Sequence, residues 1–190
     1  MMHKLTKTNQ ERVFETQRMK GVKVTYSDET GEPVLTHTII VSNPSVAIII
    51  RKDNKIAFIQ QFRSTTGETY IELPAGVIDN GESEIEAAIR ESEEETGILV
   101  KNVHSLVKGP SLLDPSKSNE NYGVVIADFD GCKERNLDEA EQIDSNILYL
   151  EETEVFTRLK NQLYEGTPFY DNLFMSGHSL YALMAYMLTK

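Results

Sequence analysis

Three glutamates lie within five residues of one predicted helix, in the segment Arg90-Glu-Ser-Glu-Glu-Glu-Thr-Gly97. Residues three and four positions apart share a helix face, so Glu91 repels both Glu94 and Glu95. The cluster also lies near the helix C-terminus, where the macrodipole adds partial negative charge. A divalent cation that takes hard oxygen ligands, magnesium or manganese, would relieve this repulsion. The alternative is an acidic face exposed to solvent, because glutamate is a good helix former.

The residues around the cluster predict an amphipathic helix that positions it. The helix is expected to begin near Glu82 or Ser83, after a turn at residues 79–81, and to end at Gly97. Apolar side chains at helical spacing form one stripe, at Ile85, Ala88 and Ile89. The three glutamates fall in one arc beside this stripe, whereas Glu93 falls outside it. The helix should therefore pack on a core and turn a carboxylate cluster to its flank.

Composition restricts the classes of protein. The 190 residues suit one domain, perhaps with an extension. The formal net charge of −11 argues against a nucleic-acid or membrane-surface binder, which would need a basic patch. The single cysteine, Cys132, excludes an internal disulfide and a thiolate metal cluster, and a reducing, cytoplasmic setting is expected. The N-terminus lacks a secretory apolar region, and the apolar stretch 180–188 is too short to span a bilayer.

The order of predicted elements indicates a mixed α/β fold. Alternating or continuous apolar runs predict strands at residues 22–26, 33–41, 46–50, 55–62, 70–73, 98–107, 122–129 and 146–150. Besides the acidic helix, amphipathic patterns predict helices at 155–163, stopped by Gly166 and Pro168, and at 178–188. This pattern is typical of a twisted sheet with helices packed on it.

The spacing of the motif residues is specific. From Gly76 the chain has five residues, Glu82, seven residues, Arg90 and Glu91, and then Glu94-Glu95, Gly97 and Ile98. This pattern resembles the signature of the Nudix hydrolases. One position departs, because the family has a bulky aliphatic residue where this chain has Ser92, and a packing compromise is expected there. The resemblance implies the Nudix fold, a mixed β-sheet sandwiched between helices (α/β/α), here with an N-terminal β-hairpin extension.

Two further segments resemble the ADP-ribose pyrophosphatase branch of that family. They are the residues 60–63 and 72–76. The loop 114–120 is also similar to a loop of that branch that ends in a glutamate, although Ser116 replaces the glycine of that loop. The N-terminal strand pair is also typical of the branch, where it contributes to a homodimer. The resemblance therefore implies an extension at residues 1–44 that forms a dimer and a Nudix hydrolase domain at residues 45–190.

The resemblance also implies the roles of the motif residues. Glu91, Glu95 and the main-chain carbonyl of Ala75 would bind Mg²⁺ directly, with Mn²⁺ as a possible substitute. Glu94 would bind a further ion or act through water. Magnesium keeps its other positions for water and substrate oxygens, which agrees with this ligand set.

Three other residues, Glu120, Arg63 and Arg90, have two open interpretations each. Glu120 is the candidate general base or a solvated loop acid. Arg63 and Glu72 are the candidate substrate-binding residues; Arg63 would grip a phosphate of the substrate, or it forms a surface ion pair. Arg90 is a substrate clamp or a residue that neutralises its helix neighbours. Glu82 would fix the helix start, and two glycines, Gly76 and Gly81, would allow the turn that presents the Ala75 carbonyl.

The leading functional prediction is Mg²⁺-dependent hydrolysis of the diphosphate bond in a nucleoside diphosphate linked to another group. ADP-ribose, cleaved to AMP and ribose 5-phosphate, is the first candidate substrate. A different nucleotide-sugar is the first alternative, and the aromatic signature of the NADH-cleaving branch is not visible after the motif. A module that senses a nucleotide without cleaving it and a plain acidic structural domain are the alternatives from other classes.

Overall fold

The computed structural model describes residues 4–16, 19–109, 111–112, 114–137, 142–164 and 176–190, with the backbone alone for 162–164. The chain divides into two compact units. The first comprises Met1–Pro44 and Pro110–Asn121, and the second comprises Ser45–Gly109 and Tyr122–Lys190. Each unit is described separately below.

The first unit is a three-stranded antiparallel sheet in the order β1-β2-β3. Its strands are β1 (Thr6–Glu15), β2 (Lys20–Ser27) and β3 (Pro33–Val41), and the last two form the hairpin that the sequence predicts. The strand β1 was not predicted. All of its residues are exposed, so its sequence lacks the apolar alternation that identifies a half-buried strand.

A loop distant in sequence belongs to this unit because it bonds to β3. The Ile40 amide donates to the Lys117 carbonyl at 2.8 Å, and the Asn119 amide donates to the Ile40 carbonyl at 3.2 Å. A ring nitrogen of His37 lies 3.2 Å from the Ser116 carbonyl oxygen. These contacts hold residues 116–119, which precede Glu120, against the edge of β3.

The second unit is built on a seven-stranded mixed sheet. Its strands are β4 (Ser45–Lys52), β5 (Lys55–Arg63), β6 (Glu68–Glu72), β7 (Ala75–Val77), β8 (Ile98–Ser105), β9 (Tyr122–Cys132) and β10 (Leu148–Glu151). The main path runs β10-β5-β4-β9-β8, with β6 on β5 and β7 on β4. The pair β4–β9 is parallel and the other pairs are antiparallel, which confirms the predicted mixed sheet. The short strand β7 was not predicted.

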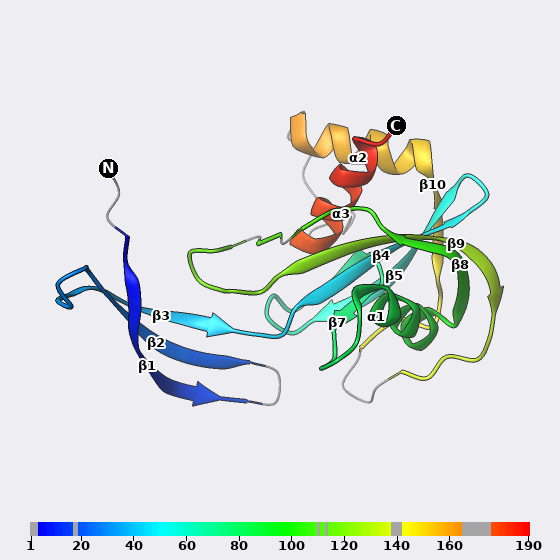
Figure 1. The fold of residues 1–190 in the computed structure, drawn as a ribbon. Helices are drawn as coiled ribbons and strands as arrows, with labels where there is room; N and C mark the ends of the chain where they lie inside the picture. The colour runs from blue at the N-terminus through cyan, green and yellow to red at the C-terminus, as the bar shows by residue number, and fades with distance from the viewer. Residues whose placement is uncertain (1–3, 17–18, 110, 113, 138–141, 165–175) are drawn as a thin grey trace. The chain divides into compact units, whose positions relative to one another are not determined.

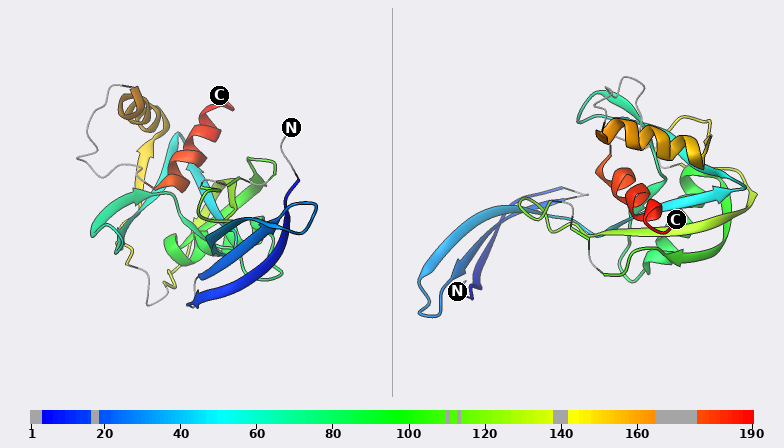
Figure 2. Two further views of the ribbon diagram at one scale, coloured as in Figure 1. Left: turned by 90° about the vertical axis from the view of Figure 1, so that its left-hand side faces the viewer. Right: turned by 90° about the horizontal axis from the view of Figure 1, so that it is seen from above.

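Helices cover both faces of this sheet (Figures 1 and 2). Along β4, Ala47 and Ile49 pack towards α2 (Glu152–Tyr164) and α3 (Gly177–Met187). The alternate residues Val46, Ile48 and Ile50 pack towards α1 (Glu84–Glu91). Each Val or Ile side chain of this set contributes about 1.5–3 kcal/mol when fully buried. The continuous apolar run of β4 is thus explained by burial on both faces, and the α/β/α arrangement is confirmed.

The acidic helix begins and ends at strong local signals. Ser83 is the N-cap of α1, its side chain accepts from the Glu86 amide, and the Glu86 side chain accepts from the Ser83 amide. This capping box explains the start, one residue beyond the expected range. The helix continues as a π-helical turn, Ser92–Thr96, which the sequence did not predict, and stops at Gly97, whose φ is 70°. That positive φ is the reason for glycine at the stop.

The helices α2 and α3 agree with the predicted helices within a few residues. The predicted stop signals Gly166 and Pro168 lie outside the described residues. Among the residues that the structure describes, none of the helices is both long enough and apolar enough to cross a membrane.

Candidate functional site

The strand β7 presents the backbone around which the site is built. It pairs with the start of β4, where Ala47 faces Ala75 and Val46 faces Gly76. A Cβ atom at Gly76 would lie 1.9 Å from the Oε1 atom of Glu91. Glycine at this position therefore lets the carboxylate pack against the backbone. The φ of Gly76 is not positive, so the turn geometry that the sequence suggested does not require glycine here. The turn itself uses Gly81, whose φ is 89°.

The second buried carboxylate reaches the same short strand. The Oε2 atom of Glu95 accepts a hydrogen bond from the Ala75 amide at 2.9 Å. Glu91 is only 6% exposed and Glu95 only 2%. Two carboxylates, four residues apart on one helix, thus converge on two consecutive backbone residues. Burial makes their charges costly unless cations or donors compensate them.

Arg90 supplies part of that compensation. Its Nη1 atom lies 2.7 Å from Glu91 and 3.0 Å from Glu94. Its Nε and Nη2 atoms donate to the two oxygens of Glu82, each at 3.0 Å, and Nη2 also donates to the Val77 carbonyl at 2.9 Å. The hydrogen bonds from Arg90 lower the pKa of Glu82, and Glu82 contributes most to raising the pKa of Arg90. One guanidinium therefore serves three carboxylates and joins the helix to the strand.

The donor set fits a divalent metal ion. In the described part of the chain, no group of three His, Cys, Asp or Glu side chains is placed so that it could hold a metal ion. However, the carboxylate of Glu91 occupies the space that a Cβ of Gly76 would fill, and Glu95 meets the adjacent residue. Carboxylate and main-chain carbonyl oxygens are the ligands that hard cations take. The three glutamates that Arg90 contacts carry more negative charge than one guanidinium offsets, and a dication would balance the excess.

Arg135 is a second cation near the cluster, and the sequence analysis missed it. Its stem lies against Gly97, where a Cβ would be 3.2 Å from the Arg135 Cγ atom. Its Nη1 atom donates to the Asp144 carbonyl at 2.8 Å, while Nε and Nη2 are buried with no hydrogen-bond partner among the described residues. Burial lowers the pKa of Arg135, and the charges of Glu95 and Asp144 oppose this effect. Its place after β9, far from the motif in sequence, gave no local signal.

Ser92 stands at the position where a packing compromise was expected. Its side chain is fully buried, and its hydroxyl donates to the Ile98 carbonyl at 2.9 Å. A hydrogen-bonded polar group thus replaces the aliphatic contact, because a buried hydroxyl is tolerated when it has a partner.

The two predicted substrate-binding residues of β5 and β6 contact each other. The Nε and Nη2 atoms of Arg63 donate to the two oxygens of Glu72 at 3.0 and 2.5 Å, and Glu72 is buried. This two-point contact orients the guanidinium. The start of α3 adjoins the same segment, since the Leu73 amide donates to the Ser179 hydroxyl at 2.9 Å.

His178 lies in the first turn of α3. Its ring packs on the Tyr122 ring, with 3.7 Å between the ring centroids. Burial, with a smaller effect of Arg63, lowers the pKa of His178 to about 4. The imidazole is therefore neutral at physiological pH, which agrees with a structural role.

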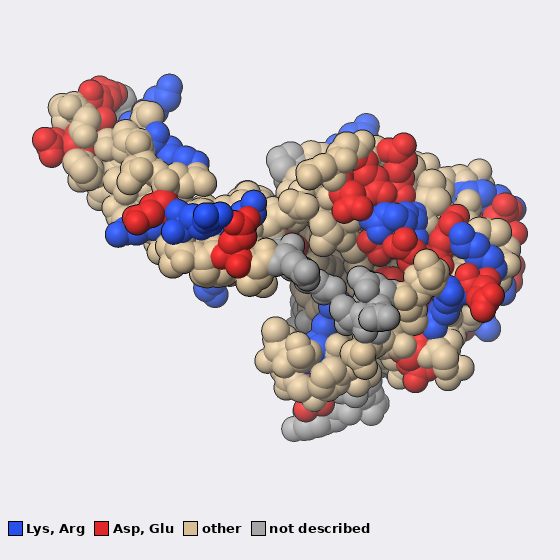
Figure 3. All heavy atoms as spheres, turned by 90° about the horizontal axis from the view of Figure 1, so that it is seen from below, with Lys and Arg blue, Asp and Glu red and all other residues tan. Residues whose placement is uncertain are grey.

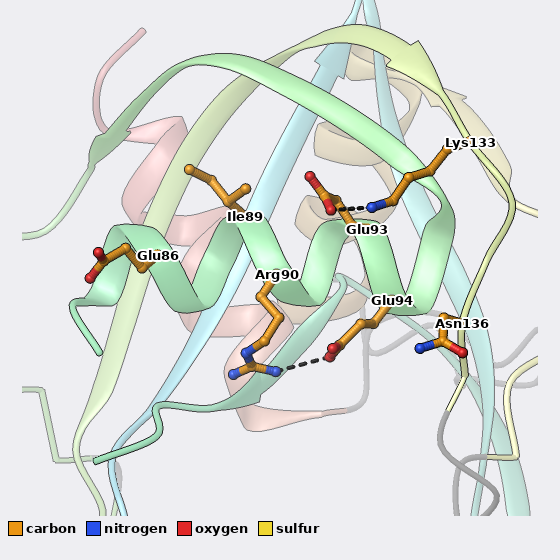
Figure 4. A pocket seen from close by; sticks show the side chains of 7 residues that line it. All are labelled: Glu86, Ile89, Arg90, Glu93, Glu94, Lys133 and Asn136. Carbon is orange, nitrogen blue, oxygen red and sulfur yellow. Dashed lines mark hydrogen bonds and ion pairs between the residues drawn. The ribbon is translucent and has the colours of Figure 1, made fainter. Parts of the chain in front are cut away.

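A groove follows the outer side of the acidic helix (Figure 4). It has a volume of about 360 Å³ and is lined by Glu86, Ile89, Arg90, Glu93, Glu94, Lys133 and Asn136. Lys133 pairs with Glu93 on one side, and Arg90 pairs with Glu94 on the other. The face that carries α1 accordingly shows acidic side chains interleaved with basic ones (Figure 3). Glu93 thus belongs to the outer groove, whereas Glu91 and Glu95 are buried.

Glu120 belongs to the first unit, whereas the other predicted site residues belong to the second. It is partly buried, and its amide donates to the Ser118 hydroxyl at 2.9 Å. The bonds of its loop to β3 give it a defined local position. Its role as a general base stays a prediction.

Known proteins resemble this chain over most of its length. A family model described as NUDIX domain matches residues 41–171. A Caenorhabditis elegans protein named as a nudix hydrolase is 31% identical over 168 residues, which are 80% of this chain and 75% of that protein. The ADP-sugar pyrophosphatase of Mus musculus is 30% identical over 141 residues, 68% of this chain and 64% of the relative.

Two further comparisons concern a shorter match and a solved structure. The ADP-ribose pyrophosphatase of Bacillus subtilis is 32% identical over 117 residues, 60% of this chain and 62% of the relative. The chain thus spans less than two thirds of the length of either pyrophosphatase. A crystal structure of an ADP compounds hydrolase aligns with a TM-score of 0.74 and 22% identity, covering 100% of this chain and 95% of that one. That likeness shows a shared fold.

We expect Gly76→Ala to destabilise the protein by about 1–3 kcal/mol, because the new Cβ overlaps the Glu91 carboxylate. The double variant Gly76→Ala/Glu91→Ala should recover most of that loss, since the clashing atoms are gone. Urea denaturation of the two single variants and the double variant measures the coupling. Additive losses would show that the close approach of Glu91 is not the reason for glycine.

We expect His178 to weaken the protein as the pH falls. Its folded pKa of about 4 lies below its ordinary value of 6.5, so between these values the unfolded chain binds a proton that the folded chain does not. The part of the free energy of unfolding that depends on the neutral His178 ring is fully present above pH 6.5. This part is lost as the pH falls through 4. Urea midpoints at pH 7 and 4.5 should differ less for His178→Gln than for wild type. The exposed His104→Gln serves as control, and equal pH dependence in all three proteins would contradict the assignment.

Proposed function

The chain belongs to the NUDIX domain family, and from this premise we propose that it hydrolyses a nucleoside diphosphate linked to a second group, with Mg²⁺ as cofactor. ADP-ribose, cleaved to AMP and ribose 5-phosphate, is the substrate that we put first. The relatives named ADP-sugar and ADP-ribose pyrophosphatase support this choice.

One observation carries the proposal: the convergence of Glu91 and Glu95 on the Ala75–Gly76 backbone, beside Arg90. A purely structural helix would gain nothing from burying two carboxylates four residues apart. A site that binds a dication needs this arrangement, because the ion requires several oxygen donors on a rigid support.

Magnesium would be held by Glu91, Glu95 and the Ala75 carbonyl, with Glu94 binding a further ion or acting through water. Mn²⁺ could replace it, since both ions take oxygen ligands. When bound, the ion would neutralise the diphosphate and lower the pKa of a water molecule.

Side chains of the protein would position the metal ligands, accept the proton and bind the substrate phosphate. Arg90 holds the glutamates at the strand and shares their charge. Glu120 would accept a proton from the water whose oxygen attacks phosphorus, while the bond from that phosphorus to the bridging oxygen breaks and the second phosphate leaves. Arg63, oriented by the buried Glu72, would contact a phosphate of the substrate.

We further propose that the protein is a cytoplasmic homodimer that binds no nucleic acid. The net charge of −11 is unfavourable for contact with a polyanion. The first unit exposes large apolar side chains on β1 and β3, at Val13, Phe14, Val34 and Leu35. Exposed apolar groups on a sheet in which β1 is an edge strand favour association with a second copy.

Glu95→Gln should lower the rate of AMP release from ADP-ribose in saturating Mg²⁺ by about a hundredfold or more, because a neutral amide is a poor ligand for a hard cation. Glu93→Gln is the matched control, since Glu93 pairs with Lys133 in the outer groove and is expected to keep most of the rate. Product-resolved chromatography measures both.

Other outcomes of this assay separate the alternatives. AMP release from another nucleotide-sugar, with none from ADP-ribose, would correct the substrate and keep the reaction. Tight nucleotide binding without product on any nucleoside diphosphate would indicate a sensing module and contradict hydrolysis. Equal losses in Glu95→Gln and Glu93→Gln would contradict the assigned metal ligands.

The dimer proposal predicts that Val13→Glu combined with Val34→Glu shifts the protein towards monomer, because charges would replace apolar contacts. Sedimentation velocity at several protein concentrations measures this. Leu188→Glu, at an exposed position in the second unit, should have no effect. A wild-type protein that sediments as a monomer at all concentrations would refute the proposal.

A further inference from the structure

We infer that two buried hydroxyls, those of Ser92 and Thr96, position the carboxylates that would bind the metal ion. This role rests on the proposed function. The two residues belong to the π-helical turn at the end of the acidic helix. Each directly follows one of the two buried carboxylates, since Glu91 precedes Ser92 and Glu95 precedes Thr96.

The hydroxyls form a closed set of hydrogen bonds with the first residue of β8. The Thr96 hydroxyl donates to the Ser92 carbonyl and accepts from the Ile98 amide at 3.0 Å. The Ser92 hydroxyl donates to the Ile98 carbonyl at 2.9 Å. Both backbone groups of Ile98 are therefore bonded to side chains of the helix end. The helix is thereby tied to the sheet at the point where the glutamates leave it.

The residues that make these hydrogen bonds are all buried. Ser92 is 0% exposed, Ile98 1% and Thr96 6%. Water cannot replace the lost partners of buried polar groups, so removal of one hydroxyl leaves backbone atoms unpaired. The turn would then shift until those atoms found new partners. Residues within that turn, Glu95 above all, would move with it.

The π-helical turn itself favours this interpretation. Turns of this kind are rare, and they are frequently found at functional sites. An extra residue in the turn changes the direction in which the following side chains leave the helix. Here the turn contains both Glu94 and Glu95, and Glu95 must reach the Ala75 amide at 2.9 Å. The hydroxyls hold the backbone in the form that allows this contact.

A simple packing role for Ser92 and Thr96 is the competing explanation. It predicts that replacement by residues of equal size leaves the carboxylates in place. Thr96→Val keeps the shape and removes the hydroxyl, whereas Thr96→Ser keeps the hydroxyl and removes a methyl group. Ser92→Ala is a second variant that removes the other hydroxyl, and it serves if Thr96→Val does not fold.

Two measurements on these variants test the inference. The first is hydrogen exchange at the Ala75 amide in metal-free protein, followed by NMR, because this amide donates to Glu95. The second is Mn²⁺ affinity, measured by calorimetry with the wild-type protein as reference. Circular dichroism and thermal melting of each variant record the change in overall stability.

We expect Thr96→Val to speed exchange at Ala75 relative to other strand amides and to weaken Mn²⁺ binding about tenfold, the lower end of the effect for groups that hold metal ligands in place. Thr96→Ser should resemble wild type in both. Ser92→Ala should follow Thr96→Val.

The inference is overturned if Thr96→Val or Ser92→Ala only lowers the melting temperature while Ala75 exchange and Mn²⁺ affinity stay as in wild type. If wild-type protein binds no Mn²⁺, even with ADP-ribose present, the proposed function fails and the metal-directed role fails with it. Exchange at Ala75 then still decides whether the hydroxyls hold Glu95.

Discussion

The close contact between two carboxylates and the strand Ala75–Val77 is the constraint on which the second unit depends. Glycine at position 76 permits it, because a Cβ there would overlap the Glu91 carboxylate. The contact requires β7 to be pinned on β4, which is buried on both faces. It also requires the helix to end in a turn that brings Glu95 to the Ala75 amide. The sheet, the strand β7 and the helix end thus together hold the two carboxylates in place.

Charge balance explains the residues around that contact. Buried carboxylates are tolerated only when cations or donors face them. Arg90 faces Glu82, Glu91 and Glu94 at once, and Arg135 lies near Glu95 from a different segment. The repulsion inferred from sequence is therefore relieved in part by the protein itself. A metal ion would neutralise the negative charge that the guanidinium groups of Arg90 and Arg135 leave uncompensated.

Local patterns predicted the sheet, the helices and the motif, because apolar periodicity and turn residues act over short distances. Contacts between distant segments could not be predicted. The strand β1 has no buried side to mark it, and β7 is too short for a pattern. Likewise, the reason for Gly76 is a side chain on the helix, and the partner of Ser92 is a carbonyl on β8. Each depends on which elements the fold brings together.

We propose above all that these carboxylates bind a dication. Titration of metal-free protein with Mn²⁺, followed by loss of the free-ion signal in electron paramagnetic resonance, tests it most directly. We expect a saturable loss of the free-ion signal with wild-type protein. With Glu91→Gln, which changes the carboxylate that packs on Gly76, much less of the signal should be lost. An unchanged free-ion signal with wild-type protein, also in the presence of ADP-ribose, would contradict it.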